Sequence, residues 1–537
     1  MYKYSINSGF INATTMEPTE LPELQSYKLF HGDTFVLDDS HQVVLTSSPT
    51  REAKEMPAIL CLRGNRTYGR SSNNKRLYKC IPDDKHIPPF LVAYEMKNVG
   101  FSKVFSNKYV LIKYVSWTDA NPVATLTNTI GDVDILENYY EYQIHCEGLA
   151  QSAQPFVKAV ASSLINNTTP TFIPTEERNG VLILTIDPEG TKDFDDALSI
   201  VEHSDCSYTV SVYIANVTAC LDAYGLWNYV ERVSTIYLPN KPRPMLPPRL
   251  SEHDCSLISG AKRVTLTMDF NCANNGDLLD VSFRNTTITV SRNYVYEEAD
   301  LLGNREYRSL FRLTNRMQPI NDSHELVAFW MTKMNRLIAE KMHDEYRTGI
   351  FRKANLLHND VLPTAVKNWK NAVCEYVAFG GDNVRHDVMQ VDKYIHITSP
   401  IRRLVDLLNM TRFQVCIGVP LSCEAMLFYE KWINRLDIIN DQMRAIRRVQ
   451  TQCSLLAMCS TSEEPIECDA YLFDKRMFDK HPVNEEIFMF SVYLKSLNLM
   501  YKMKATDADN GDTIKVRVVL FSDEDSLKKK IRLQLIK

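Results

Sequence analysis

The sequence predicts an α+β multidomain protein with a small N-terminal β-barrel, a central mixed α/β domain and a second small barrel at the C-terminus. Short β-type runs separated by Gly, Asn, Asp and Pro clusters fill residues 27–148, as in a small barrel. Residues 172–458 mix strand patterns with long amphipathic helices. From residue 459 onward the chain returns to short strand-like runs with turn signals between them.

Composition is that of an ordinary soluble globular protein, with 537 residues of which 45% are hydrophobic and 24% charged. The formal net charge of −5 argues mildly against a polyanionic partner. A groove can nevertheless carry a local field of its own, and a site rich in acidic ligands lowers the net charge by itself. Composition therefore excludes a disordered or collagen-like chain but leaves the partner open.

Cysteine usage and the N-terminal residues predict the compartment. Thirteen cysteines without any Cys-x-x-Cys pair indicate neither a disulfide framework nor a zinc ribbon. The first residues lack the pattern of a secretory signal, and no stretch reaches the ~18 apolar residues of a membrane helix. We expect a soluble intracellular protein of the cytoplasm or nucleus, not secreted, with reduced thiols and no membrane contact.

The N-terminal third divides into an arm, a barrel and a linker. Residues 1–26 are polar and turn-rich, which predicts a flexible arm. Residues 149–171 predict a linker helix, clearest after Pro155 and broken by Asn166–Pro170. Between them we expect a barrel of OB type over residues 27–148, built from the runs Thr34–Leu37, Val43–Thr46, Ala58–Leu62, Phe90–Tyr94 and Tyr109–Trp117.

The central and C-terminal domains follow at residues 172–458 and 459–537. Strands are predicted at Val181–Ile186 and Thr209–Ile214, and a core helix at Ser323–Tyr346 behind the start signal Asn321-Asp322-Ser323. Five strands suit an OB-type barrel, a common module for single-stranded nucleic acid. They are Ala470–Phe473, Ile487–Leu494, Leu499–Met503, Thr513–Phe521 and Lys530–Ile536.

Four aspartates directly follow the apolar strand 181–186, at positions 187, 193, 195 and 196. Neighbouring carboxylates repel, and partial burial makes each charge costlier, so a positive group must lie among them. Hard oxygen ligands favour Mg²⁺ or Mn²⁺, and two such ions can activate water and stabilise an in-line attack on phosphate. An acidic surface loop is the alternative. A calcium loop fits poorly, because the sixth position from Asp187 is Lys192 and the twelfth from Asp193 is Ser204.

A second candidate lies at Thr398-Ser399-Pro400, which reads as a helix start with Ser399 as N-cap. Arg402 and Arg403 fall in the first turn, where a cation is unfavourable unless an anion is also present. The pattern therefore predicts a phosphate site made of a helix N-terminus and guanidinium groups. A pair of solvated surface arginines is the alternative.

Three ordered blocks carry a resemblance to a known family. They are Thr185-Ile186-Asp187 with Asp193-Phe194-Asp195-Asp196-Ala197, the segment from Tyr237-Leu238-Pro239 to Cys255-Ser256-Leu257, and His396–Arg403. Together they resemble the RNase II / RNase R (RNB domain) family of exoribonucleases. Residues 81–88 are similar to the cold-shock barrel of its exosome-type members, so we expect their layout without the endonuclease domain and without an extra first cold-shock barrel.

The resemblance implies a cold-shock/OB-type barrel, an RNB catalytic domain and a C-terminal OB-type RNA-binding barrel. It implies a hydrolytic 3′→5′ exoribonuclease that degrades single-stranded RNA to nucleoside 5′-monophosphates with two Mg²⁺ or Mn²⁺ ions. Asp187, Asp193, Asp195 and Asp196 would be the metal ligands, and Asp195, Arg402 and Arg403 the catalytic residues. By the same resemblance, the RNA-binding residues are Tyr237, which stacks on a base near the 3′ end, and Tyr296, which senses the ribose.

Departures from the family pattern leave two alternatives open. Tyr213, Asn216 and Leu404 stand where members usually carry His, Asp and Tyr. Ala328 and Phe329 align with paired glutamates near the ribose, which predicts measurable cleavage of single-stranded DNA. The alternatives are a catalytically weak or inactive RNA-binding protein and a nuclease that also acts on single-stranded DNA. Retention of all four aspartates favours the enzyme.

Overall fold

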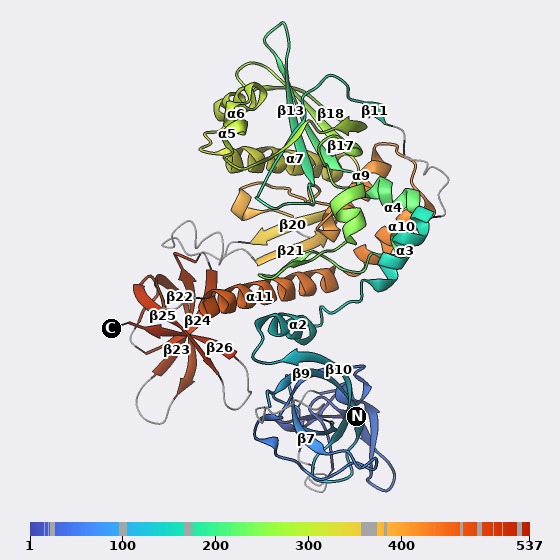
Figure 1. The fold of residues 1–537 in the computed structure, drawn as a ribbon, viewed down its shortest axis with the longest axis vertical. Coiled ribbons are helices and arrows are strands. Elements are labelled where there is room, and N and C mark those ends of the chain that lie inside the picture. The colour runs from blue at the N-terminus through green and yellow to red at the C-terminus, as the bar shows by residue number, and fades with distance from the viewer. Residues whose placement is uncertain are drawn as a thin grey trace. The chain divides into compact units, whose positions relative to one another are not determined.

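The computed structural model describes residues 1–537 except 16, 20, 22–26, 96–104, 166–172, 174, 356–372, 381–383, 462–464, 481–485, 498, 507, 523–528 and 537. The chain forms two compact units. One contains residues 1–150, 238–240 and 448–537, and the other contains residues 151–237 and 241–447. The predicted multidomain α+β architecture is confirmed (Figure 1).

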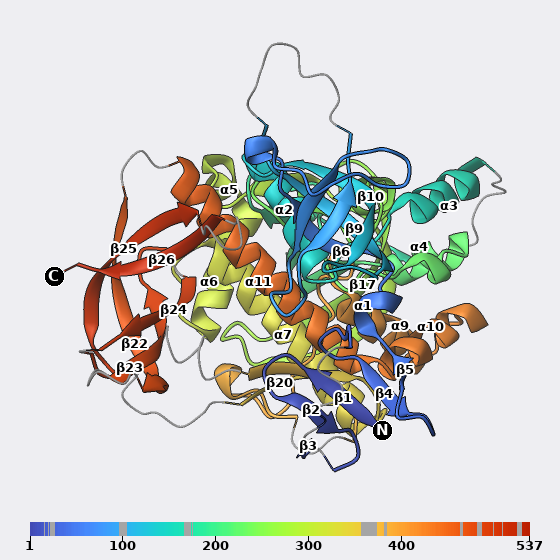
Figure 2. The same cartoon turned by 90° about the horizontal axis from the view of Figure 1, so that it is seen from below.

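The first residues form a small antiparallel sheet where a flexible arm was expected. Its five strands follow the order β3-β2-β1-β4-β5 (Figure 2). Tyr4 and Phe10 pack with ring centroids 5.5 Å apart, and Phe10 lies 6.0 Å from the buried Phe35. Alternating aromatic residues therefore supply a core that the polar turns between them obscure in the sequence. The strands are β1 Tyr2–Ser5, β2 Gly9–Asn12, β3 Pro18–Thr19, β4 Thr34–Leu37 and β5 Val43–Ser47.

The predicted N-terminal barrel is a closed barrel of five strands in the order β10-β8-β7-β6-β9. The strands at residues 34–37 and 43–47, expected in this barrel, pair in the first sheet. Alternate residues of β7 point inward, among them Tyr78 and Cys80. The helix α1 Pro49–Glu52 precedes the first strand of the barrel. The barrel strands are β6 Met56–Leu60, β7 Leu77–Pro82, β8 Phe90–Ala93, β9 Lys108–Ser116 and β10 Val123–Asp132.

A mixed seven-stranded sheet in the order β11-β18-β17-β14-β13-β12-β19 forms the centre of the second unit. The predicted strand at 181–186 is β12, which begins at Leu184, and the one at 209–214 lies within β14. Only β11 with β18 and β12 with β19 pair in parallel among the described strands of this sheet. The strands are β11 Glu176–Glu177, β12 Leu184–Asp187, β13 Asp196–Glu202, β14 Tyr208–Ala215, β17 Lys262–Cys272, β18 Leu278–Thr289 and β19 Arg292–Val295.

Helices α6 Arg305–Met317 and α7 Ser323–Asp344 pack on the central sheet (Figure 1). The predicted core helix is α7, and Asp322 caps its N-terminus by accepting a hydrogen bond from the Glu325 amide at 2.8 Å. The apolar face of α7 is buried against the sheet, and the side chains of Trp330 and Met334 are fully buried. Further helices among the described residues of the unit are α3 Gln154–Ile165, α4 Val217–Tyr224, α5 Ala299–Gly303, α9 Leu404–Cys416 and α10 Cys423–Ile433, and α11 Leu436–Thr461 follows them.

Helix α9 begins at Leu404, so the helix start predicted at Ser399 is wrong. The amides of Leu404 and Thr235 donate to the carbonyl oxygens of Val233 and Arg402, at 2.9 and 3.0 Å. This strand-like pairing keeps the preceding residues out of the helix. Sequence periodicity could not reveal it, because the partner segment lies more than 160 residues earlier. Short elements nearby are β15 Ile236–Tyr237, β16 Pro242–Arg243, η4 Leu250–Asp254, β20 Ile350–Asn355 and β21 Val373–Ala378.

All five predicted C-terminal strands are present, in an antiparallel sheet of order β24-β23-β22-β25-β26. Its first strand is central, with the second and third on one side and the fourth and fifth on the other. The N-terminal barrel has the same connectivity and adds a closing pair, and the linking helix α2 Leu136–Cys146 follows that barrel. The strands are β22 Ile466–Lys480, β23 Glu486–Leu494, β24 Leu499–Ala505, β25 Thr513–Ser522 and β26 Lys529–Leu535.

No disulfide joins any of the thirteen cysteines, all of which lie within the described residues. Among the described residues, no helix has the length and apolar character to cross a bilayer. The predicted break at residues 166–170 lies outside the described residues.

Candidate active site

One cleft of about 690 Å³ in the second unit brings together all eight side chains selected from the sequence. They come from four separate parts of the chain, between 187 and 403. The cleft is lined by Asp187, Asp193, Asp195, Asp196, Tyr237, Tyr296, Arg402 and Arg403.

Adjacent strands position the carboxylates. Asp187 ends β12 and Asp196 begins β13, and these strands pair antiparallel with Leu184 opposite Leu198. The end of one strand therefore lies beside the start of the next. Asp195 immediately precedes β13, and its carbonyl oxygen accepts a hydrogen bond from the Ala215 amide at 2.8 Å.

Burial makes these carboxylates costly to ionise. Burial, reinforced by neighbouring aspartates, raises the pKa of Asp187 and of Asp196 to about 7 and that of Asp195 to about 8. Burial also raises the pKa of Asp193. Positive charge close to the cluster is needed to keep Asp187, Asp195 and Asp196 ionised at neutral pH.

Arg402 supplies part of that charge through Asp195. The two carboxylate oxygens of Asp195 accept from the Ile401 amide at 2.9 Å and from Nε of Arg402 at 3.1 Å. Asp195 is only 3% exposed, whereas the side chain of Arg402 is 44% exposed. Asp195 therefore fixes a guanidinium group that still faces the cleft, where it can bind an anion.

Arg403 is held more firmly by protein groups. Its Nε lies 2.9 Å from Oδ2 of Asp406, and its Nη2 donates to Oγ of Ser399 at 3.1 Å. Asp406 is fully buried and also accepts from the Ser399 amide at 2.8 Å. Arg403 thus binds the turn before α9, and Arg402 is the more accessible of the two arginines. Sequence reasoning missed Asp406, although its spacing of three residues from Arg403 was visible.

The site suits a divalent cation. Oδ2 of Asp187 is buried without a hydrogen-bond partner, and Asp187 is the largest source of repulsion on Asp196. A buried acceptor without a donor requires an explanation, and a cation between these two carboxylates provides one. No three His, Cys, Asp or Glu side chains of the described residues form a metal-binding group. Mg²⁺ commonly uses one or two carboxylates and takes its other ligands from water and substrate phosphates, so the pair fits it.

Two tyrosines line the cleft together with the carboxylates. Tyr237 is 42% exposed, as a stacking platform requires. Tyr296 follows β19, and its amide donates to the Asp187 carbonyl at 3.2 Å. Its ring lies 5.2 Å from the ring of His324, which also lines the cleft. His324 was missed from the sequence because a lone histidine in a helix carries no motif.

The sequence alignment placed both Ala328 and Phe329 near the ribose, but the cleft wall next to Tyr296 contains only one of them. Ala328 lines the cleft, but Phe329 packs edge-on against Trp330 with centroids 5.3 Å apart. The carboxylate of Glu325 accepts from the Asn321 amide at 2.7 Å. Only Ala328 of the two residues aligned with glutamates therefore faces the cleft. Helix geometry explains this, because neighbouring residues in a helix point in different directions.

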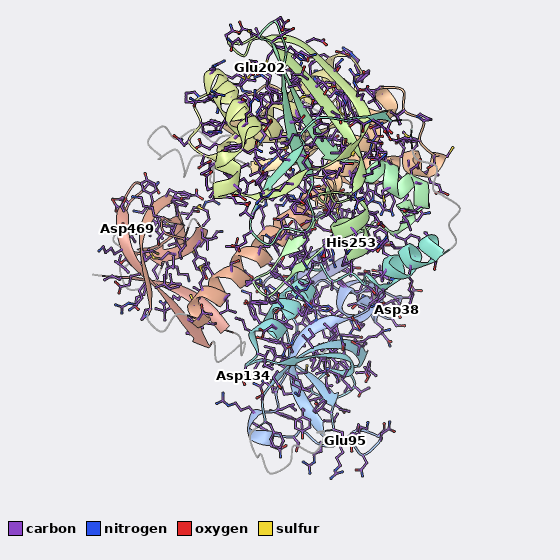
Figure 3. All side chains as sticks on the ribbon, turned by 45° about the horizontal axis from the view of Figure 1, so that its top comes forward. Asp38, Glu95, Asp134, Glu202, His253 and Asp469 are labelled. Carbon is purple, nitrogen blue, oxygen red and sulfur yellow. The ribbon has the colours of Figure 1, made fainter. Side chains whose placement is uncertain are left out.

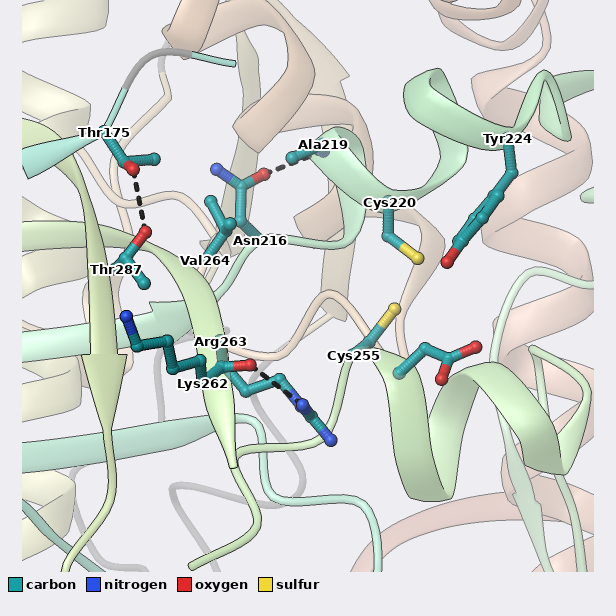
Figure 4. A pocket seen from close by; sticks show the side chains of 11 residues that line it. Thr175, Asn216, Ala219, Cys220, Tyr224, Cys255, Lys262, Arg263, Val264 and Thr287 are labelled. Atoms are coloured by element: carbon teal, nitrogen blue, oxygen red, sulfur yellow. Dashed lines mark hydrogen bonds between the residues drawn. The ribbon is translucent and has the colours of Figure 1, made fainter. Parts of the chain in front are cut away.

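Arg263, which supports the segment that braces the aspartate loop, lines a second cavity of about 400 Å³ (Figure 4). The guanidinium of Arg263 donates to the carbonyl oxygens of Ser256 and His253 at 2.8 and 2.7 Å. Fully buried Ser256 donates through Oγ to the Lys192 carbonyl at 2.7 Å and accepts from the Phe194 amide at 3.0 Å. Ser256 thus fixes the loop on both sides of Asp193. The thiols of Cys220 and Cys255 point toward each other nearby (Figure 4).

Residues 176–310 match the family model of the RNB domain. DIS3-like exonuclease 2 of Schizosaccharomyces pombe is 27% identical over 312 residues, covering 53% of this chain and 32% of that protein. Ribonuclease R of Chlamydia muridarum is 24% identical over 341 residues, covering 49% and 48%. The chain spans about a third of the length of the first relative and about half of the second. The resemblance to the RNase II / RNase R family is confirmed.

Solved structures share the fold over most of the chain. Mycoplasma genitalium RNase R, in complex with ribose-methylated single-stranded RNA, has a TM-score of 0.67 and 14% identity, covering 95% of both chains. Yeast Ssd1, described as a pseudonuclease, has a TM-score of 0.55 and 13% identity, covering 86% of this chain and 66% of Ssd1. At these identities the likeness concerns the fold alone, and the fold alone does not separate nuclease from pseudonuclease.

Metal binding is expected to raise the melting temperature. A ligand at about a hundred times its Kd stabilises the folded state by ~2.7 kcal/mol. Mg²⁺ should therefore raise Tm by several degrees in wild type and much less in Asp187→Asn. In EDTA the variant should melt at or above the wild-type temperature, because one repelling charge is gone. Scanning calorimetry with Glu202→Gln, an exposed carboxylate at the far end of β13 (Figure 3), provides the control. Equal Mg²⁺ shifts in wild type and Asp187→Asn would contradict the site.

Ser256→Ala should loosen the aspartate loop. The Phe194 amide would lose its buried acceptor, which costs roughly 1–3 kcal/mol, and displacement of Asp193 should weaken the Mg²⁺-dependent Tm shift. Ser259→Ala serves as the matched control, because its hydroxyl donates to the Ser291 carbonyl and not to the loop. A Mg²⁺ shift of wild-type size in Ser256→Ala would show that the loop is held by other contacts.

Proposed function

We propose that the chain is a hydrolytic, metal-dependent 3′→5′ exoribonuclease that degrades single-stranded RNA to nucleoside 5′-monophosphates. The observation that carries the proposal is the cleft itself, which joins a carboxylate with one buried, unpartnered oxygen, an arginine and two tyrosines. These are the groups that phosphodiester hydrolysis and base stacking need. The direction and the substrate come from the resemblance to the RNase II / RNase R family.

Each residue has a distinct proposed role. Asp187 and Asp196 would hold one Mg²⁺ or Mn²⁺ ion, and Asp193 would be available for a second. When bound, such ions would supply an activated water and neutralise the charge that develops on the scissile phosphate. Asp195 orients Arg402, which binds that phosphate and holds it for in-line attack. Arg403 supports the turn that carries Arg402.

Other protein residues are proposed to contact the bases, the ribose and the remaining phosphates of the RNA. Tyr237 stacks on a base near the 3′ end, and Tyr296 contacts the adjacent ribose. The N-terminal barrel adds a basic segment at residues 63–79, which contains six Lys or Arg residues and no Asp or Glu. All six are at least partly exposed, so they can bind phosphates without reading sequence.

The first test uses single-stranded RNA labelled at its 5′ end, with Mg²⁺ or with EDTA, separated on a sequencing gel. We expect progressive shortening from the 3′ end with Mg²⁺ and none with EDTA. Release of the label as a mononucleotide at the earliest times would indicate the opposite direction. Binding without turnover would favour the second candidate, an RNA-binding protein that retains the fold, which the likeness to Ssd1 raises.

Asp195→Asn separates chemistry from binding in the same assay. An amide at this position presents an NH₂ group to the Ile401 amide or to Arg402, and donors do not pair with donors. We expect hydrolysis to fall at least a hundredfold, because misplacing the phosphate clamp is costly. RNA affinity should change by only a few-fold. Turnover above a tenth of wild type would refute the role of Asp195, whereas Glu202→Gln should cleave at the wild-type rate.

Discrimination between RNA and DNA should rest on few groups. Ala328 lines the cleft wall next to Tyr296, the proposed ribose contact, and it cannot hydrogen-bond a 2′-hydroxyl. We therefore expect single-stranded DNA to be cleaved measurably but more slowly than RNA. Ala328→Glu should suppress DNA cleavage by roughly ten- to a hundredfold relative to RNA, the equivalent of one unpaired polar group at about 1–3 kcal/mol. His324→Ala should shift the ratio the other way.

Equal-length RNA and DNA oligomers compared by kcat/KM provide the measurement. Glu325→Gln is the matched control, because its side chain is turned to Asn321. Undetectable DNA cleavage in wild type, or a ratio unchanged by both Ala328→Glu and His324→Ala, would contradict the assignment of this wall.

A further inference from the structure

We propose that a pocket between α5 and α6, outside the catalytic cleft, binds a nucleoside monophosphate. The pocket has a volume of about 400 Å³, within the range of small-molecule sites. Its lining combines three arginines with aromatic, apolar, amide and carboxylate side chains.

The three arginines come from one face of α6. Arg305, Arg308 and Arg312 are spaced by three and four residues, and all three are exposed. Arginines at this spacing are neighbours on a helix and repel one another. Among the described residues none of the three has a carboxylate within ion-pair distance, in a chain whose net charge is −5. An anion in the pocket would relieve the repulsion.

The acidic groups of the pocket are already used by the backbone. Glu297 accepts from the Ser323 amide at 2.7 Å, and Asp322 accepts from the Glu325 amide at 2.8 Å as the cap of α7. Within the described part of the chain, Arg312 donates to the Arg308 carbonyl and to Oγ of Ser309, both at 3.3 Å, and to no other group. The guanidinium groups therefore keep donors for a phosphate, which arginine binds in a bidentate manner.

The remaining lining fits the other parts of a nucleotide. Phe311 is half-buried, and its ring lies 5.9 Å from that of buried Tyr307, so it offers a face for a base. Asn321 and Asp322 offer polar groups for a ribose or a base edge. The alternative is that the three arginines simply form the solvent-exposed face of an amphipathic helix. That alternative explains neither the aromatic residues beside them nor the cavity.

The pocket adjoins the cleft through shared segments. Glu297 follows Tyr296, and Asp322 lies two residues before His324, and both Tyr296 and His324 line the catalytic cleft. The nucleotide is therefore either a released mononucleotide or a nucleotide of a bound strand. The source of the ligand rests on the proposed function, but the binding itself does not.

Calorimetric titration with 5′-AMP in EDTA tests the pocket without catalysis, with adenosine and inorganic phosphate as partial ligands. We expect saturable binding of 5′-AMP that weakens at least tenfold in Arg308→Ala/Arg312→Ala. Arg316→Ala is the matched control, since Arg316 is an exposed arginine of α6 outside the pocket, and it should change affinity less than twofold. Phe311→Ala should reduce the advantage of 5′-AMP over phosphate.

A second arm identifies the source. If Arg308→Ala/Arg312→Ala also weakens binding of a single-stranded RNA oligomer, the pocket takes a nucleotide of the strand. If only 5′-AMP is affected, it takes the free mononucleotide. Binding of 5′-AMP that is lost in Arg402→Ala but unchanged in Arg308→Ala/Arg312→Ala, or no saturable binding, would overturn the proposal. Neither result would bear on the gel assay of RNA cleavage.

Discussion

The cost of burying like charges on two adjacent strands governs the structure of the site. Asp187, Asp195 and Asp196 lie where β12 ends and β13 begins, and burial raises the pKa of each well above the usual range of a carboxyl group. Such a cluster is stable only with compensating charge and donors. Arg402 and the Ile401 amide compensate Asp195, while Oδ2 of Asp187 has no donor. The imbalance is what a divalent cation would correct.

Other contacts in the second unit serve to hold this cluster in place. The pairing of residues 233–235 with the turn at 402–404 delivers Arg402 to Asp195. Ser256 fixes the loop that carries Asp193, and Arg263 fixes the segment that carries Ser256. These supports come from residues far apart in sequence, so the geometry of the cleft depends on contacts between distant segments of the chain. Rigid support of this kind is what positions a phosphate for in-line attack.

Local patterns predicted much of the fold and the composition of the site. Alternation and turn signals located most barrel strands, and apolar periodicity located α7 and its cap. The carboxylates were recognisable because they follow a buried strand. The arm was misjudged because its aromatic core depends on Phe35, which lies outside it. The start of α9, the ion pair of Arg403 with Asp406 and the inward turn of Phe329 depend on partners or directions that sequence spacing does not encode.

Anomalous diffraction from crystals grown with Mn²⁺ tests the central claim most directly, because it locates the ion independently of turnover. We predict an anomalous peak in contact with Oδ2 of Asp187 and a carboxylate oxygen of Asp196, and loss of that peak in Asp187→Asn. A Mn²⁺-saturated crystal without a peak between these two carboxylates, in a protein that cleaves RNA, would contradict the assignment.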